Sequence, residues 1–181
     1  LGIILALVVV SLGAYTRLTH AGLGCPDWPG CYGFIDVPET AEKIAVAEKA
    51  FPERPVEPQK AWNEMIHRYF AGALGLLVLA LFILTVKYRN ENAPVKLAGF
   101  LLLLVTFQAA LGMWTVTMML MPIIVMAHLL GGFTTLCLLY LIYLRTSRFR
   151  IASGDYSLRS KIPLAFVAII VLTVQIALGG W

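Results

Sequence analysis

The chain has 181 residues, of which 60% are hydrophobic and only 13% are charged, and its mean hydropathy is +0.83. An ordinary soluble domain is excluded, because about 25% of the residues in such domains are charged. The net charge is +4, but the basic residues flank apolar runs and form no separate patch. A nucleic-acid-binding protein is therefore excluded as well.

Apolar runs divide the chain into segments that could span a membrane. A bilayer core takes about 20 helical residues, and three runs reach that length, at residues 65–86, 97–118 and 123–144. A run at 162–181 reaches the end of the chain, and the first run, 1–14, is short. We expect 1–14 to be the inner part of a span whose start is missing, and the chain to be a piece of a longer protein. We predict an all-α integral membrane protein with a four-helix transmembrane bundle.

Basic residues in the short loops predict the orientation of this bundle. Three of them lie between the second and third runs, and five lie after the fourth run: Lys87, Arg89 and Lys96, then Arg145, Arg148, Arg150, Arg159 and Lys161. The loop at 117–122 has no charge. By the positive-inside rule both basic loops, around Asn90 and Gly154, are cytoplasmic. The long loop at 15–64 then lies on the other side of the membrane.

The 15–64 loop contains a predicted helix and a cysteine pair. Residues 40–51, between Pro38 and Pro52, have the pattern of a short amphipathic helix. Cys25 and Cys31 flank a turn-rich segment in an oxidising compartment, which favours a disulfide. A purely structural disulfide and a redox-active pair are both open at this point.

Two histidines lie inside the apolar runs at matched depth. Counted at about 1.5 Å per residue from Lys87 and Arg145, His67 and His128 both lie roughly 25–30 Å from the cytoplasmic edge. An ionisable side chain inside a span marks a functional site by default, and two imidazoles on different helices suit the axial coordination of haem iron. Small residues that leave room for a flat ligand follow each histidine by one turn: Ala71 and Gly72, and Gly131 and Gly132. The alternative is that each imidazole is buried and hydrogen-bonded to a neighbouring helix.

Charged residues surround the histidines at the outer end of the spans. Glu64 precedes His67 by one turn and shares its helix face. Arg17 and Arg68 suit the propionates of a haem, because arginine pairs with carboxylates; interfacial snorkelling is the alternative. We expect His20 to be a solvated loop residue.

Together these motifs resemble those of the haem A synthase family. Residues 13–23 are similar to its first outer motif, Glu64-Met65-Ile66-His67-Arg68 to its second-helix motif, and 108–116 and 128–132 to its third and fourth helices. The resemblance implies an eight-helix protein of two four-helix halves, each with its own histidine pair. In that arrangement residues 1–161 form the N-terminal haem-binding half, and 162–181 begin the fifth helix.

The resemblance also implies an activity and roles for residues. Family members oxidise the C8 methyl group of haem O to the formyl group of haem A, which terminal oxidases use. The implied cofactor or substrate is haem, as haem O or haem B with its iron, and the implied axial ligands are His67 and His128. Glu64 is the expected catalytic residue, since a carboxylate there could accept a proton or stabilise developing positive charge. The remaining expected site residues are the haem-binding Arg17, Arg68, Gly131 and Gly132 and the disulfide Cys25–Cys31.

The expected location is the inner (plasma) membrane of the cell. Expected partners are haem O and haem A, haem O synthase (protohaem farnesyltransferase), terminal oxidase assembly factors, the lipid bilayer and a second copy of the chain. Two other functions are open to a chain with these histidines. One is a bis-histidine cytochrome b that passes electrons without substrate chemistry, and the other is a transporter that relays protons.

Overall fold

The structure is a computed structural model that describes residues 1–91, 93–147 and 159–180. These residues form helices α1 (Gly2–Leu18), α2 (Ala41–Ala50), α3 (Pro58–Lys87), α4 (Val95–Thr117), α5 (Pro122–Thr146) and α7 (Ile162–Gly180), and a 3-10 turn at Arg89–Glu91. Within the described ranges no strand occurs, only an isolated bridge between Cys31 and Phe34, so the all-α prediction is confirmed. The predicted loop around Gly154 and residue Trp181 lie outside the described residues.

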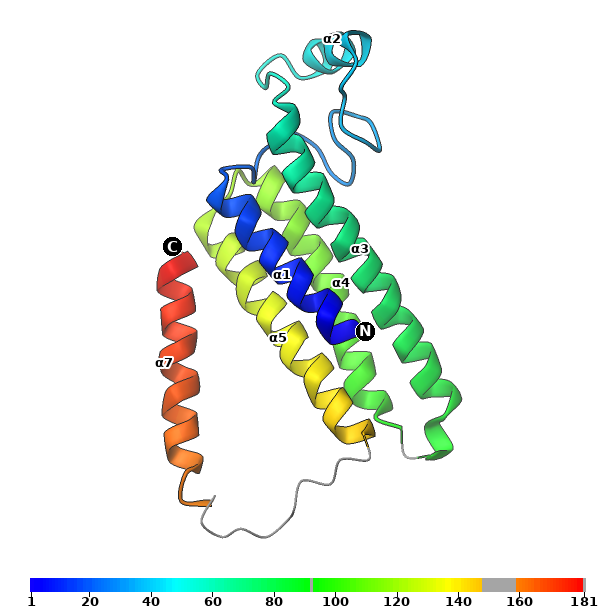
Figure 1. Cartoon of the computed structure of the whole chain (residues 1–181), viewed down its shortest axis with the longest axis vertical. Helices are drawn as coiled ribbons and strands as arrows, with labels where there is room; N and C mark the ends of the chain where they lie inside the picture. Colours follow the sequence, from blue (N-terminus) through cyan, green and yellow to red (C-terminus); the bar gives the residue numbers. More distant parts are fainter. Residues whose placement is uncertain (92, 148–158, 181) are drawn as a thin grey trace.

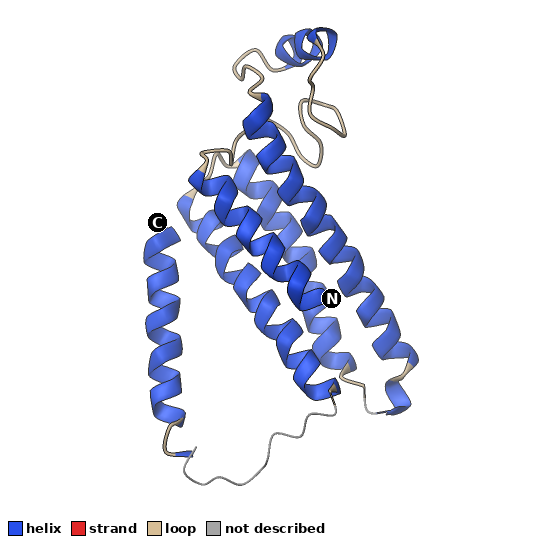
Figure 2. Cartoon of the chain, in the orientation of Figure 1, coloured by secondary structure: helices blue, strands red, loops and turns tan. Residues whose placement is uncertain are grey.

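Four helices form the bundle that carries the site. α1 packs on α3 and α5, and α4 packs on α3 and α5, while α7 packs against α5 (Figure 1). We call one end of the bundle the loop end, because the 19–57 loop with α2 lies there (Figure 2). It is formed by the C-termini of α1 and α4 and the N-termini of α3 and α5. The opposite end, where Lys87, Lys96 and Arg145 lie, we call the basic end.

Helices α3, α4, α5 and α7 are each long and apolar enough to cross a membrane, and α1 is shorter at 17 residues. α3, α4 and α5 extend beyond the predicted runs 65–86, 97–118 and 123–144 at one or both ends. The largest difference is at α3, which begins at Pro58 because proline fits the first helical turn, where its missing N–H costs no hydrogen bond. Since α1 also continues to Leu18, the expected 15–64 loop is reduced to 19–57.

The amphipathic helix expected between Pro38 and Pro52 is α2. Thr40 caps its N-terminus, because the side chain accepts a hydrogen bond from the backbone N–H of Lys43 at 3.3 Å. This bond satisfies one of the donors that a helix start leaves unpaired. α2 then places Ala47 in the buried interior of the loop.

Buried apolar side chains form two separate clusters. The bundle cluster consists of Ala6, Leu74, Val78, Ala98, Leu101, Leu139 and Ile142. A second cluster, which we call the loop core, consists of Cys25, Cys31, Tyr32, Val37, Ala47, Ala61 and Met65. Along α3, His67 lies between Met65 of the loop core and Leu74 of the bundle cluster. The histidine site is therefore placed where the folded loop meets the membrane-spanning bundle.

Candidate functional site

The structure brings His67 of α3 and His128 of α5 side by side, as expected from their similar depth. Their ring centres are 6.4 Å apart, and the ring planes are nearly perpendicular at 87°. Two imidazoles that bind one metal ion from opposite sides have ring centres roughly 6 Å apart, because each metal–nitrogen bond is about 2.0 Å. The pair therefore has the separation that two axial ligands of a haem iron require.

Unpaired buried polar atoms mark the same region. The Nδ1 atoms of His67 and His128, and Nε2 of Gln108 on α4, are buried without a hydrogen-bond partner in the described part of the chain. Leaving such an atom unpaired costs about 1–3 kcal/mol, and native structures pair the great majority of them. Neither Nδ1 atom has a partner there, but the backbone of Val9 on α1 lies close enough to hydrogen-bond the His67 ring, and the backbone of Gln108 on α4 does the same for His128, so the alternative of imidazoles held by neighbouring helices stays a prediction. Unpaired side-chain nitrogen atoms of this kind could bind a metal ion or donate hydrogen bonds to a ligand.

Glycines of the other two helices lie against the imidazoles. A Cβ atom built on Gly13 of α1 would lie 3.1 Å from Cε1 of His67, and one on Gly112 of α4 would lie 3.5 Å from Cε1 of His128. All four helices of the bundle therefore contribute to the site. Both glycines belong to motifs that the sequence analysis named. Their contact with the histidines depends on which helices pack together, and residue spacing along one helix does not reveal that pairing.

The glycines expected to make room beside the histidines have different neighbours. Gly72 is exposed, and a Cβ atom there would meet no described atom within 4 Å, so the space beside it is open and its expected role stays a prediction. Gly131 faces the side chain of Gln108, and Gly132 lies near Val10, with a Cβ-to-Cγ2 distance of 3.8 Å. Gly131 and Gly132 thus line α5 one turn below His128, farther from the loop end.

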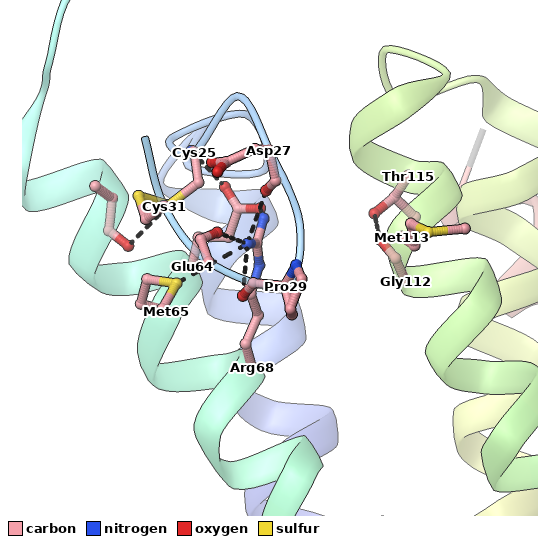
Figure 3. Close-up of polar contacts among 12 residues, drawn as sticks. Cys25, Asp27, Pro29, Cys31, Glu64, Met65, Arg68, Gly112, Met113 and Thr115 are labelled. Carbon is pink, nitrogen blue, oxygen red and sulfur yellow. Dashed lines mark hydrogen bonds and ion pairs between the residues drawn. A yellow bond between two sulfur atoms is a disulfide. The ribbon is translucent and has the colours of Figure 1, made fainter. Parts of the chain in front are cut away.

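Glu64 and Arg68 tie α3 to the disulfide loop (Figure 3). The buried Glu64 carboxylate accepts a hydrogen bond from the backbone N–H of Cys25 at 3.0 Å and forms an ion pair with Arg68. Arg68 also donates to the backbone carbonyls of Asp27 at 2.9 Å, Pro29 at 3.3 Å and Gly30. Both side chains are therefore held by contacts with the disulfide loop.

Cys25 and Cys31 form a disulfide, as predicted, and both are fully buried in the loop core. Between them, the Asp27 carboxylate accepts hydrogen bonds from the backbone N–H groups of Tyr32 at 2.6 Å and Gly33 at 2.8 Å. The Tyr32 hydroxyl donates to the carbonyl of Pro55 at 3.0 Å, and burial raises the pKa of this phenol above its ordinary value. These contacts give the disulfide loop one defined conformation against α3.

The loop approaches α3 closely just before the disulfide. A Cβ atom on Gly24 would lie 2.5 Å from the carbonyl carbon of Lys60, a distance that only glycine permits at this residue. The N–H of the next residue, Cys25, then reaches Glu64. Gly24 therefore allows the contact that joins the loop to the carboxylate of α3.

Arg17 and His20 lie at the loop end of α1. Arg17 is exposed in the last turn of α1, one turn beyond Gly13, and therefore on the helix face that contacts His67. His20 is exposed in the loop, as expected, with a φ of 52°. Arg17 therefore lies nearer the loop end than the histidine pair, whereas Gly131 lies nearer the basic end.

Comparisons with known proteins show the family of the chain. The family model of the cytochrome oxidase assembly protein COX15-CtaA matches residues 1–181. The chain is 56% identical to the haem A synthase of Shewanella oneidensis over 179 residues, which cover 99% of this chain and 54% of that protein. It is 32% identical to the haem A synthase of Geobacillus kaustophilus over 161 residues, which cover 86% of this chain and 45% of that protein. No solved structure matches the chain.

A shorter similarity involves a different protein. The protohaem IX farnesyltransferase of Haloarcula marismortui is 34% identical over 80 residues, which cover 44% of this chain and 13% of that protein. The chain spans about half the length of the haem A synthases that it matches. The family match, in contrast, extends over every residue of the chain. The chain therefore belongs to the COX15-CtaA family of cytochrome oxidase assembly proteins.

Proposed function

We propose that this chain is the N-terminal, haem-binding half of a haem A synthase, which oxidises the C8 methyl group of haem O to a formyl group. The observation that carries the proposal is the pair of His67 and His128, whose ring centres are 6.4 Å apart and whose Nδ1 atoms lack partners among the described residues. The 56% identity to a protein named haem A synthase supports it.

The chain is a multi-pass membrane protein, and its arrangement in the membrane is part of the proposal. Residues 1–161 are the first half, and the segment 162–181, whose described part is α7, begins the second; the packing of α7 outside the four-helix bundle supports this division. We place the protein in the inner (plasma) membrane with the 19–57 loop on the extracytoplasmic side. The basic residues at the opposite end support this orientation.

In this half, His67 and His128 hold the haem through its iron. Gly13 and Gly112 have no side chains, and so let α1 and α4 pack directly against the two imidazoles. Arg17, at the loop end, suits the propionates, because carboxylates at a membrane surface need cations or water. Haem O, when bound, supplies the redox-active iron and the methyl group that is oxidised.

Glu64 is the proposed catalytic carboxylate. Oxidation of a methyl group releases protons, and a carboxylate near the haem can accept one or stabilise developing positive charge. The Cys25 N–H and Arg68 hold the two oxygens of Glu64 in fixed positions. Glu64 thereby connects the folded outer loop with the helix that carries His67.

The chemistry of the substrate implies its neighbours in the cell. A farnesylated haem is largely apolar, so it would reach and leave this site within the membrane. We propose that a protohaem farnesyltransferase supplies haem O and that oxidase assembly factors receive haem A. The farnesyl chain has room between helices or in the lipid.

The test uses His67→Ala and His128→Ala in the full-length protein. Each variant should lower the haem content and change the absorption spectrum, because the buried iron loses one of two strong nitrogen ligands. His20→Asn is the matched control, since it removes an exposed imidazole at a φ of 52° that asparagine also adopts. Haems are extracted from each protein, and haem O and haem A are quantified.

Wild-type protein and His20→Asn should both show a bis-histidine haem spectrum and produce haem A. Unchanged spectra and haem A yields in both His67→Ala and His128→Ala would refute the ligand assignment. A protein that binds haem through the pair but never forms haem A would instead be an electron-transfer cytochrome.

A further inference from the structure

Gln108 is a half-buried polar residue that the proposed function does not use. It lies on α4, which is a strongly apolar helix. Its side-chain nitrogen Nε2 is buried without a hydrogen-bond acceptor among the described residues. An amide donor buried in this way is unfavourable unless a ligand supplies the acceptor. The question is which ligand group would lie at this depth.

Gln108 lies one helical turn farther from the loop end than the histidine pair. Gly112, one turn later on α4, faces His128, and Gly131, one turn after His128 on α5, faces Gln108. A Cβ atom built on Gly131 would overlap the Gln108 side chain, at 2.7 Å from its Cδ atom. The amide therefore occupies the gap that Gly131 leaves between α4 and α5, on the bilayer side of the imidazoles.

A haem held by His67 and His128 has two chemically different edges. Its propionates are charged, so they face the loop end, where Arg17 and water lie, because charge near the bilayer centre is costly. The opposite, apolar edge then lies at the depth of Gln108. In haem B this edge has vinyl and methyl groups, which accept no hydrogen bond. In haem O one vinyl group is replaced by a hydroxyethylfarnesyl group, which carries a hydroxyl oxygen.

We propose that Gln108 selects the farnesylated haem by donating a hydrogen bond from Nε2 to this hydroxyl oxygen. The inference rests on the proposed function, since it requires a haem between His67 and His128. Bound haem B would leave the amide unpaired, and sites built to bind a hydroxyl group reject analogues that lack it. Gln108 is thus a specificity residue that contacts the substrate away from the methyl group that reacts.

The test measures haem affinity and needs no turnover. Full-length apoprotein is titrated with haem O and with haem B, and the part of the bis-histidine absorption that is lost in His67→Ala gives each Kd for this site. Gln108→Leu keeps an apolar side chain of similar size and removes the donor. Thr106→Val is the matched control on the same helix, since the Thr106 side chain is exposed and its hydroxyl donates to its own helix at Leu102.

Wild-type protein and Thr106→Val should bind haem O about tenfold more tightly than haem B, which corresponds to one hydrogen bond. Gln108→Leu should lose most of this ratio while it still binds haem B. A ratio in Gln108→Leu equal to that of the wild type would overturn the proposal.

A second measurement uses the wild-type protein alone, so it does not depend on the folding of a variant. Haem O is compared with its dehydrated derivative, which keeps the farnesyl chain but lacks the hydroxyl group. The derivative should bind about tenfold more weakly. Equal affinities with a bis-histidine spectrum would overturn the role of Gln108 alone. If the wild-type protein gave no such spectrum with any of the three haems, the proposed function would fail with it.

Discussion

At the scale of single residues, Glu64 and Arg68 form a buried ion pair whose remaining hydrogen-bonding atoms are used by the disulfide loop. Burying two charges is costly, and the cost is offset only where good geometry and further hydrogen bonds satisfy both groups. Here the Cys25 N–H binds the carboxylate, and the carbonyls of Asp27 and Pro29 bind the guanidinium. The pair therefore specifies where the loop lies on α3, in addition to any part that Glu64 takes in chemistry.

Glu64→Gln separates these two contributions. Glutamine keeps the size and an oxygen that accepts the Cys25 N–H, but it removes the negative charge beside Arg68. We expect the free energy of unfolding to fall by about 1–3 kcal/mol, haem to remain bound, and conversion of haem O to stop. The measurements are denaturant unfolding, haem content, and quantification of haem O, the hydroxylated intermediate and haem A.

The control for Glu64→Gln is Glu57→Gln. Glu57 is an exposed carboxylate that precedes the same helix and pairs with Lys60 at 2.7 Å, and such surface pairs contribute little. The control should match the wild type in stability and haem A yield. A wild-type haem A yield from Glu64→Gln would remove Glu64 from the mechanism.

At the scale of elements, the 19–57 loop is a small folded unit fixed to the first turns of α3. The disulfide and Ala47 of α2 are part of the loop core, and Ala61 and Met65 of α3 complete it. The Glu64 contact with Cys25 then joins the loop to α3 three residues before His67. A change in the loop is thus expected to reach the site through α3.

Cys25→Ser tests this coupling. Opening a disulfide that closes so short a loop should lower stability by about 2 kcal/mol and loosen the contact between the Cys25 N–H and Glu64. Mass spectrometry of alkylated peptides, with and without reductant, measures the pairing in the wild type. Cys137→Ser is the control, since Cys137 is a free and exposed cysteine on α5.

In aerobically prepared wild-type protein that is denatured before alkylation, alkylation without reduction should modify Cys137 and leave Cys25 and Cys31 unmodified. Two alkylated thiols at Cys25 and Cys31 would contradict the disulfide in the isolated protein. If Cys25→Ser makes as much haem A as Cys137→Ser, a redox role for the pair is refuted and only the structural role remains.

At the scale of the whole molecule, the spans were predictable because about 20 apolar residues in a row are a strong signal. Counting residues from the basic end of two such spans was enough to predict that His67 and His128 lie at the same depth in the membrane. The start of α3 at Pro58 was not predictable from hydropathy, since its first turns are polar and lie outside the apolar run. The boundary between the outer loop and α3 is therefore known from the structure and not from the sequence.

The neighbours of the histidines were harder to predict than their depth. Gly13 and Gly112 lie beside them because α1 packs on α3 and α4 packs on α5, and a single sequence does not specify helix pairing. Gly72 lies on the exposed face of α3, where the space beside it is open. Arg68 was expected to bind propionates, whereas the structure places its donors on Glu64 and loop carbonyls. A lone amide in an apolar run was the available signal for Gln108, by the same argument that singled out the histidines.

The orientation of the whole bundle depends on charge at its two ends. Lys87, Arg89 and Lys96 surround the turn between α3 and α4, whereas the turn between α4 and α5, at 118–121, has no charge. Positively charged short loops remain in the cytoplasm during insertion. The basic end is therefore expected in the cytoplasm, which leaves the 19–57 loop, its disulfide and the haem site near the opposite surface.

Single cysteines introduced into Cys137→Ser protein test this orientation in intact cells. Ile35→Cys lies in the 19–57 loop, where the native side chain is 86% exposed, and it should react with a membrane-impermeant maleimide without lysis. Asn90→Cys, in the exposed turn after α3, should react only after the cells are opened, because the inner membrane shields it. Each variant serves as the control for the other, since lysis exposes both. Labelling of Asn90→Cys but not Ile35→Cys in intact cells would contradict the predicted orientation. The haem site and the disulfide would then lie at the reducing, cytoplasmic surface, where a stable disulfide is not expected.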